Sequence, residues 1–213
     1  MLLPIKAIIH LSVGEKSRGI ARFALKKLAL SRFYGTLRLA QDASQSVERT
    51  RMPRTTILTI GHSDHDTETF MGLLRQHDII LIVDVRSQPY SRWASQFNRE
   101  SLRDALEAAG LGYHYMGDKL GGRPSDPNAY ASGGPDYGEM EASPSYQAGI
   151  DELLELGADR RLAVMCSEGD YRECHRHLLI TQTLLKRGAR VVHVKPDGQT
   201  AEGERVAQQL SLF

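Results

Sequence analysis

The chain has 213 residues, of which 41% are hydrophobic, and its formal net charge is +1. This length and composition predict one domain with a full hydrophobic core, and no apolar run approaches the roughly 18 residues that a membrane span requires. The charge is unevenly divided, because residues 1–54 hold 11 Lys and Arg against 3 Asp and Glu, which leaves 16 against 23 elsewhere. The acidic remainder argues against an extensive nucleic-acid surface, since phosphate backbones are bound through Lys and Arg.

Residues 1–54 are predicted to be a basic N-terminal extension. Ile20, Phe23, Ala24 and Leu28 fall on one face of a helix surrounded by Lys and Arg, which is typical of a basic amphipathic helix. Two interpretations stay open at this point. The segment is either such a helix, suited to an acidic surface, or a stretch without packed structure ahead of Met52.

From residue 56 the pattern alternates between short apolar runs and amphipathic stretches, which predicts strands joined by helices. Strands are expected at 56–60, 79–83, 112–116, 162–165 and 191–194. Helices are expected after an Asp66 cap, over 99–109 after Asn98, over 144–157 after Ser143, and from Cys174 to Gly188. Strand-helix-strand units of this kind are parallel and right-handed. The predicted fold class is therefore α/β, with a single mostly parallel sheet covered by helices on both faces in a Rossmann-like, three-layer arrangement.

The predicted α/β domain covers residues 55–198, and residues 199–213 are expected to form a flexible tail. One long connection interrupts the alternation, because residues 117–143 are rich in Gly, Pro, Ser and Asp and show no periodic pattern. Long loops without secondary structure are uncommon inside compact domains and are typically lids, binding loops or insertions. This loop starts where a predicted strand ends, so we expect it to lie beside the functional edge of the sheet.

Polar side chains follow the ends of the predicted strands, and parallel strands end at the same edge of a sheet. They are His62, Ser63, Asp84, Arg86, Lys119, Arg123, Cys166 and Glu168. The start of the next helix adds Cys174, His175 and Arg176. Both cysteines of the chain lie in this region, and a chain with two cysteines and no secretory signal is expected in the reducing cytoplasm, where thiols are reactive or bind metals.

Several of these motifs together resemble a known family. They are Cys166-x-Glu168 followed after five residues by Cys174-His175-Arg176, TIGHS at 59–63, DVRSQPYS at 84–91, and the glycine pair at 121–122. This combination is similar to the bacterial domain of unknown function 488 family, which is related to the YeaO-like proteins. The resemblance covers about residues 55–198. It implies no reaction and no cofactor, because the family has no assigned activity.

A phosphatase is one chemistry that the cysteines could serve. Cys166 followed by Arg172 has the Cys-x5-Arg spacing of cysteine phosphatases, in which backbone N–H groups and an Arg hold phosphate above a thiolate. However, Glu168 and Asp170 place negative charge where phosphate oxygens would bind. The pattern therefore favours this class only weakly.

Metal binding is a second chemistry, because the thiols of Cys166 and Cys174 and the imidazoles of His175 and His62 suit zinc. The spacing differs from the short paired knuckles of structural zinc sites. In addition, adjacent residues diverge by about 100° on a helix, so Cys174 and His175 are not expected to converge. Metal binding therefore stays a minority hypothesis, and the sequence assigns no residue as a metal ligand.

A pocket for an anionic group is the chemistry that we expect. Its predicted catalytic residues are Asp84, Cys166, Glu168, Cys174 and His175, and its predicted anion-binding residues are His62, Ser63, Arg86, Arg123 and Arg176. Two classes of protein stay open. One is an enzyme that acts on an anionic or nucleotide-like group in DNA repair or nucleotide metabolism. The other is a noncatalytic binding or adaptor module in which Asp84, Arg86 and Arg176 form a structural ion-pair network.

The last five residues carry a separate signal. Gln209, Leu210, Leu212 and Phe213 belong to a QLSLF peptide that resembles the short motif by which bacterial replication and repair proteins dock on the sliding clamp of the DNA polymerase. The resemblance implies that the two closing apolar residues fill a pocket on the clamp. The alternative is that these apolar residues fold back on the domain.

Overall fold

Six strands form one sheet in the computed structural model, which describes residues 55–123, 130–131 and 134–206. The sheet order is β3-β2-β6-β1-β7-β8. The strands are β1 (Thr56–Gly61), β2 (Leu81–Asp84), β3 (Gly112–Tyr115), β6 (Leu162–Cys166), β7 (Arg190–Val194) and β8 (Thr200–Glu202). All neighbours pair in parallel except β7 and β8, which are antiparallel. The prediction of a single mostly parallel sheet is confirmed.

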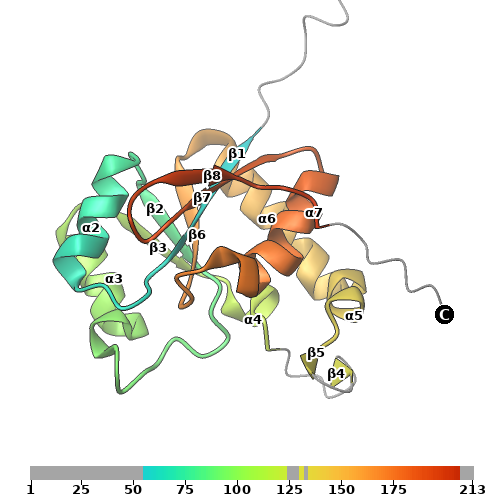
Figure 1. Ribbon diagram of the computed structural model, residues 1–213, viewed down its shortest axis with the longest axis horizontal. Coiled ribbons are helices and arrows are strands. Elements are labelled where there is room, and N and C mark those ends of the chain that lie inside the picture. The colour runs from blue at the N-terminus through green and yellow to red at the C-terminus, as the bar shows by residue number, and fades with distance from the viewer. Residues whose placement is uncertain (1–54, 124–129, 132–133, 207–213) are drawn as a thin grey trace, which may run out of the picture. The chain divides into compact units, whose positions relative to one another are not determined.

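Both faces of the sheet are covered, which explains the continuous apolar runs of its strands. Helices α2 (Thr67–Gln76) and α3 (Arg99–Ala108) lie on one side of the strands, and α6 (Pro144–Asp159) and α7 (Gln182–Lys186) lie on the other (Figure 1). Successive strand residues point to opposite faces, so Ile57 packs in the core under α6 and Leu58 packs in the core under α2. The predicted three-layer arrangement is therefore present.

The predicted helix starts are correct in position, but only one of the three predicted caps forms. The side chain of Asp66 accepts a hydrogen bond from the backbone N–H of Thr69 at 2.7 Å. Asn98 and Ser143 occupy the cap positions of α3 and α6 without a side-chain cap bond. Asn98 instead accepts from the backbone N–H of Ser91 at 2.7 Å, which ties the loop after β2 to the start of α3.

The described part of the loop between residues 117 and 143 contains secondary structure, which corrects the prediction of a connection without it. It contains α4 (Gly117–Leu120), the antiparallel pair β4 (Tyr130–Ala131) and β5 (Gly134–Pro135), and α5 (Tyr137–Ala142). Leu120 and Met140 are buried in the core beneath α6, so two apolar residues anchor the two short helices. Isolated apolar residues of this kind carry no periodicity, and the sequence pattern does not reveal them.

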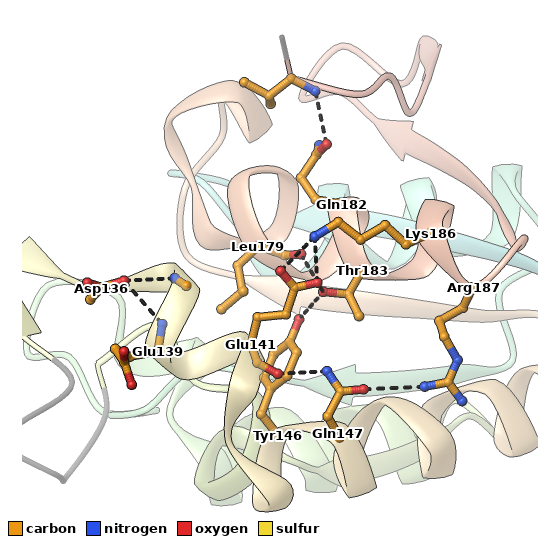
Figure 2. A network of polar contacts seen from close by, with 12 residues as sticks. Asp136, Glu139, Glu141, Tyr146, Gln147, Leu179, Gln182, Thr183, Lys186 and Arg187 are labelled. Atoms are coloured by element: carbon orange, nitrogen blue, oxygen red, sulfur yellow. Dashed lines mark hydrogen bonds and ion pairs between the residues drawn. The ribbon is translucent and has the colours of Figure 1, made fainter. Parts of the chain in front are cut away.

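A network of polar side chains fixes α5 against α7 (Figure 2). The carboxylate of Glu141 accepts from Lys186 Nζ at 2.7 Å and from the Thr183 hydroxyl at 3.1 Å. The Tyr146 hydroxyl of α6 lies 3.0 Å from the same Thr183 hydroxyl. These contacts hold the end of α5 in a fixed position relative to α6 and α7.

The segment predicted as one helix from Cys174 to Gly188 is divided into two helical segments of different kinds. A 3₁₀ turn, η3 (Tyr171–Glu173), is followed by a π-helical segment, η4 (Arg176–Thr181), which runs into α7. Wide π turns inside helices are frequent at functional sites. Here the Thr181 hydroxyl donates to the carbonyl of Arg176 at 2.7 Å and supports the wide turn.

The start of the predicted flexible tail forms the sixth strand. Residues 200–202 make β8, in which Glu202 pairs with Val192 of β7. Gln182 then binds the chain after β8, because its amide contacts Glu204 O at 3.0 Å and the N–H of Val206 at 2.9 Å. The N-terminal extension and the QLSLF peptide lie outside the described residues. No helix in the described part of the chain is long and apolar enough to span a membrane.

Candidate functional site

A cavity of about 480 Å³ opens at the carboxyl ends of β2 and β6. These two strands are parallel neighbours in which Asp84 pairs with Met165, so the residues that follow them meet at one place. The predicted site residues that line the cavity are Arg86, Arg123, Cys166, Glu168, Cys174 and His175. The structure therefore brings six of the predicted residues together around one hollow, and a cavity of this volume suits a small-molecule ligand.

Two thiols and one imidazole form a compact cluster in the cavity wall. Cys166 is the last residue of β6, and Cys174 and His175 directly precede η4. His175 Nδ1 lies 3.8 Å from Cys166 Sγ and 3.6 Å from Cys174 Sγ. All three atoms lie within 4.8 Å of one another.

The expectation that Cys174 and His175 diverge is wrong, because only one of them has a helical backbone. Cys174 is extended, with φ −113° and ψ 145°, whereas His175 has φ −55° and ψ −20°. The 100° rotation between neighbours applies only inside a helix. The side chains therefore converge, and the geometric argument against a metal site fails.

Arg176 is fully buried behind the cluster, and it does not line the cavity as predicted. Its Nε and its backbone N–H each donate to Cys174 Sγ at 3.4 Å, and its Nη2 donates to the carbonyl of Glu168. Among the described residues, no carboxylate forms an ion pair with this guanidinium. A buried charge requires a partner, so the anion beside Arg176 is the Cys174 thiolate.

The two cysteines therefore differ in protonation. A hydrogen bond from the Cys166 thiol, together with His175 and Arg176, lowers the pKa of Cys174 to about 3. The same hydrogen bond to Cys174, together with burial, raises the pKa of Cys166. The pair holds one proton, which lies on Cys166, and the negative charge lies on Cys174.

Asp84 lies beneath the cavity and orients Arg86. Its carboxylate accepts from Arg86 Nε at 2.9 Å and from Arg86 Nη2 at 2.7 Å, and the Tyr113 hydroxyl donates to it at 2.8 Å. Arg86 Nη2 also donates to the carbonyl of Phe97 at 2.8 Å. Asp84 is fully buried and does not line the cavity. Its position suits a residue that fixes a guanidinium, and the predicted ion-pair network includes Arg86 but not Arg176.

His62 and Ser63 lie outside the cavity lining. The His62 ring stacks on Phe97 at 4.4 Å, its Nδ1 donates to the carbonyl of Ser63 at 2.9 Å, and burial lowers its pKa to about 4. Ser63 has a positive φ of 50°, and its hydroxyl donates to Asp64. Lys119 also lies apart from the cavity and pairs with Glu152 at 2.7 Å.

The structure does not support the phosphatase hypothesis, because Arg172, the arginine that would bind phosphate, does not line the cavity. Arg172 is largely exposed and pairs with Asp170 at 2.6 Å, outside the cavity lining. Hydrogen bonds from Arg172 also lower the pKa of Asp170 to about 2. The guanidinium nearest the cluster comes instead from Arg176, two positions after Cys174.

Eight residues that line the cavity were not among the predicted functional residues, and four of them bear on ligand binding or on the packing of the site. These four are Ser87, Tyr90, Gly122 and Tyr137. The Ser87 hydroxyl accepts from the backbone N–H of Arg123 at 2.9 Å. A Cβ on Gly122 would lie 2.7 Å from His175 Cγ, so only glycine lets the backbone pack against the imidazole. The motifs DVRSQPYS and GG contain three of the four, so their motif context was the available signal.

The fold and the site define a class of α/β domain in which a thiol and imidazole cluster lies beside an arginine-lined cavity at the carboxyl edge of a parallel sheet. The chain belongs to the family described as domain of unknown function DUF488, whose model matches residues 66–182, more than half of the chain. The match confirms the resemblance and covers a shorter range than the expected 55–198. No match was found among curated proteins or among solved structures.

Proposed function

We propose that this protein is an enzyme that acts on an anionic, nucleotide-like group in DNA repair or nucleotide metabolism. The observation that carries the proposal is that Cys174, held as a thiolate by Arg176, and the guanidinium of Arg86 meet in one cavity. Both cysteines are buried, but they line the cavity with Arg86 and Arg123, and a thiolate stabilised by a guanidinium is typical of reactive sites. A reactive group beside an anion-binding group is the arrangement that such a reaction requires.

The anion would be held mainly by Arg86 and Arg123. Arg86 uses Nε and Nη2 for its contacts with Asp84 and Phe97, which leaves its other amino group without a partner among the described residues. Because Asp84 compensates its charge, Arg86 acts mostly as a rigid hydrogen-bond donor. Arg123 is exposed at the cavity and forms no ion pair within the described part of the chain, so it supplies the uncompensated positive charge.

The tyrosines of the cavity support a nucleotide-like substrate. Tyr90 and Tyr137 both line the hollow, and aromatic rings stack on nucleobases regardless of base identity. The volume of about 480 Å³ lies within the range of small-molecule sites. Glu168 is an exposed carboxylate at the cavity and is the residue best placed to transfer protons to or from a bound substrate.

A binding experiment tests this proposal. Purified full-length protein would be titrated with a panel of nucleoside monophosphates and with inorganic phosphate, and binding would be followed by calorimetry. Arg123→Gln should weaken binding about tenfold or more, because it removes the uncompensated charge. Arg172→Gln is the matched control, since it removes an exposed arginine outside the cavity. Absence of binding, or equal loss in both variants, would contradict the proposal.

The alternative function, a noncatalytic binding or adaptor module, is favoured by one observation. Asp84, Arg86, Tyr113 and Phe97 form a closed hydrogen-bonded network beneath the cavity. A network of this kind can serve stability alone. The two functions separate in the panel above, because an adaptor would bind no small anion with dependence on Arg123.

We also propose that the QLSLF peptide tethers the domain to the DNA polymerase sliding clamp. The support comes from the sequence, since the peptide lies beyond the described residues. The described chain reaches Val206, which is about half exposed, so the segment that follows starts from the surface of the domain. A tether would raise the local concentration of the domain near DNA, which an acidic domain cannot achieve by its own charge.

A further inference from the structure

We propose that Cys166, Cys174 and His175 form a zinc site with an open fourth position. The site itself is inferred from the geometry of three side chains, and its role in catalysis rests on the function proposed for the cavity. Thiolate and imidazole groups are the ligands that zinc prefers, and three protein ligands with one open position are typical of catalytic zinc.

The distances between the ligand atoms fit tetrahedral zinc. Zinc lies about 2.3 Å from sulfur and about 2.0–2.1 Å from nitrogen, so a tetrahedral angle separates a sulfur and a nitrogen ligand by about 3.6 Å. His175 Nδ1 lies 3.6 Å from Cys174 Sγ and 3.8 Å from Cys166 Sγ. All three atoms lie within 4.8 Å of one another. Both sulfur–nitrogen distances therefore fit a tetrahedral ion bound to these side chains.

The elements around the cluster hold the ligands in place. Cys166 belongs to β6 and pairs with Gly61 of β1, so its backbone is part of the central sheet. The N–H of Cys174 donates to the carbonyl of Tyr171 at 3.2 Å, which closes the turn before η4. Gly122 packs directly on the His175 ring. Ligands that are fixed before the metal arrives bind it with little loss of conformational entropy.

Arg176 occupies the position of an outer partner of a zinc thiolate. Its Nε and its backbone N–H both donate to Cys174 Sγ at 3.4 Å. Hydrogen bonds from such partners orient metal ligands and tune their charge. The other imidazole nitrogen, His175 Nε2, is buried and has no hydrogen-bond partner in the described part of the chain.

The charge of the site gives the metal a role in binding the proposed substrate. Asp84 compensates the charge of Arg86, whereas Arg176 has no carboxylate partner among the described residues. Zinc is bound by cysteines as thiolates, so two cysteine ligands would neutralise the charge of the ion and leave the charge of Arg176 uncompensated. The three ligands line the cavity, so the open position faces an anionic substrate or a water molecule, whose pKa zinc lowers.

The experiment measures the metal and its ligands without an activity assay. The full-length protein would be purified without chelator or metal-affinity resin, and zinc per chain would be counted. Zinc would then be replaced by Co²⁺, whose absorption reports thiolate ligation and tetrahedral geometry. We expect one zinc per chain, and a Co²⁺ spectrum with thiolate charge-transfer bands.

Three ligand variants and one control test which side chains bind the zinc. Cys166→Ser, Cys174→Ser and His175→Asn should each weaken zinc binding by more than the roughly 10–100-fold that loss of an outer partner costs. His177→Gln is the matched control, because the His177 ring contacts His193 instead of the cluster. The zinc affinity of this variant should equal that of the wild type. Circular dichroism identifies any variant that fails to fold, and the wild-type Co²⁺ spectrum decides the question without variants.

Two results would overturn the zinc site. One is a protein that takes up neither zinc nor Co²⁺, with both thiols free to titrate. The other is a Co²⁺ spectrum without thiolate bands, which would mean an adventitious ion only. The nucleotide titration is independent of both results, because the loss of nucleotide binding in Arg123→Gln can be measured in metal-free protein. Conversely, a protein that binds zinc but no anion would support the metal site and contradict the proposed function.

Discussion

The guanidinium of Arg176 is fully buried, and its Nε donates to the Sγ of Cys174 at 3.4 Å. This contact joins a charge that has no carboxylate partner among the described residues to the negatively charged sulfur of the cluster. Neither residue can be removed without leaving the other charge alone in the interior. The pair therefore connects the stability of the domain with the chemistry of its cavity.

The first prediction concerns this pair. Arg176→Gln should lower the free energy of unfolding by about 3 kcal/mol, because a buried thiolate would lose its compensating charge. Urea denaturation of the purified variant measures the change. Arg172→Gln removes an exposed arginine paired with Asp170 and should cost less than about 1 kcal/mol. Similar losses in the two variants would show that Arg176 carries no special electrostatic role.

The second prediction concerns Asp84 and Arg86. Asp84→Asn should destabilise the domain by about 3–5 kcal/mol, since it leaves the Arg86 guanidinium buried without its ion-pair partner. The double variant Asp84→Asn/Arg86→Met should be more stable than Asp84→Asn alone, because neither charge is then left unpaired. A double-mutant cycle of urea denaturation measures the coupling. Additive losses would contradict a direct interaction between the two side chains.

The third prediction concerns the glycine behind the imidazole. Gly122→Ala should lower the free energy of unfolding by about 1–3 kcal/mol, because the new Cβ would lie 2.7 Å from His175 Cγ. Gly72→Ala is the matched control, since no atom lies within 4 Å of a Cβ at that position in α2. Alanine there should leave stability unchanged or raise it by up to about 1 kcal/mol. Thermal denaturation of both variants distinguishes the sites.

The fourth prediction concerns pH. Burial lowers the pKa of His193 from 6.5 to about 3, so the folded protein keeps this ring neutral where the unfolded chain is protonated. The unfolded state then binds more protons, and stability is lost as the pH falls from about 6.5 to about 3, by about 2–3 kcal/mol at pH 4. Unfolding of His193→Gln at several pH values should show a shallower decline.

The same variant compared at pH 8 supplies the reference for that experiment. His193 also accepts or donates a hydrogen bond with Thr59 at 2.7 Å and stacks on Tyr171. The loss of these contacts lowers the stability of the variant at every pH. This loss is measured at pH 8, where His193 of the wild type is neutral in both the folded and the unfolded state. Subtracting the stability difference at pH 8 from the difference at lower pH leaves the contribution of His193 protonation. Parallel pH profiles for the two proteins would assign the acid instability to other groups.

The fifth prediction concerns the QLSLF peptide. The full-length chain should bind the sliding clamp with a Kd of about a micromolar, because an extended peptide must become ordered on docking. Leu212→Ala/Phe213→Ala should abolish binding, since it removes both apolar anchors. Ser211→Ala lies in the same peptide and should bind like the wild type. Equal binding of all three chains would remove the tether from the proposed function.

The sequence alone determined the layout of the sheet and the edge at which the site lies. Leu162 to Met165 is a continuous apolar run and Thr56 to Ile60 is β-branched and mostly apolar, which is typical of parallel strands with both faces covered. Parallel strands end at one edge, so residues that follow them, such as Arg86 and Cys166, were expected at that edge. Periodicity and chain order are local properties, and they sufficed for these conclusions.

Only the tertiary structure decided which side chains face the cavity. The apolar stripe predicted a regular helix from Cys174, whereas the extended backbone at Cys174 and the π-helical turn after His175 rotate both side chains toward Cys166 and send Arg176 behind them. The direction of a side chain depends on the type of turn that carries it. Turn type is fixed by distant contacts, such as the carbonyl of Glu168 that binds Arg176, and no pattern of neighbouring residues records them.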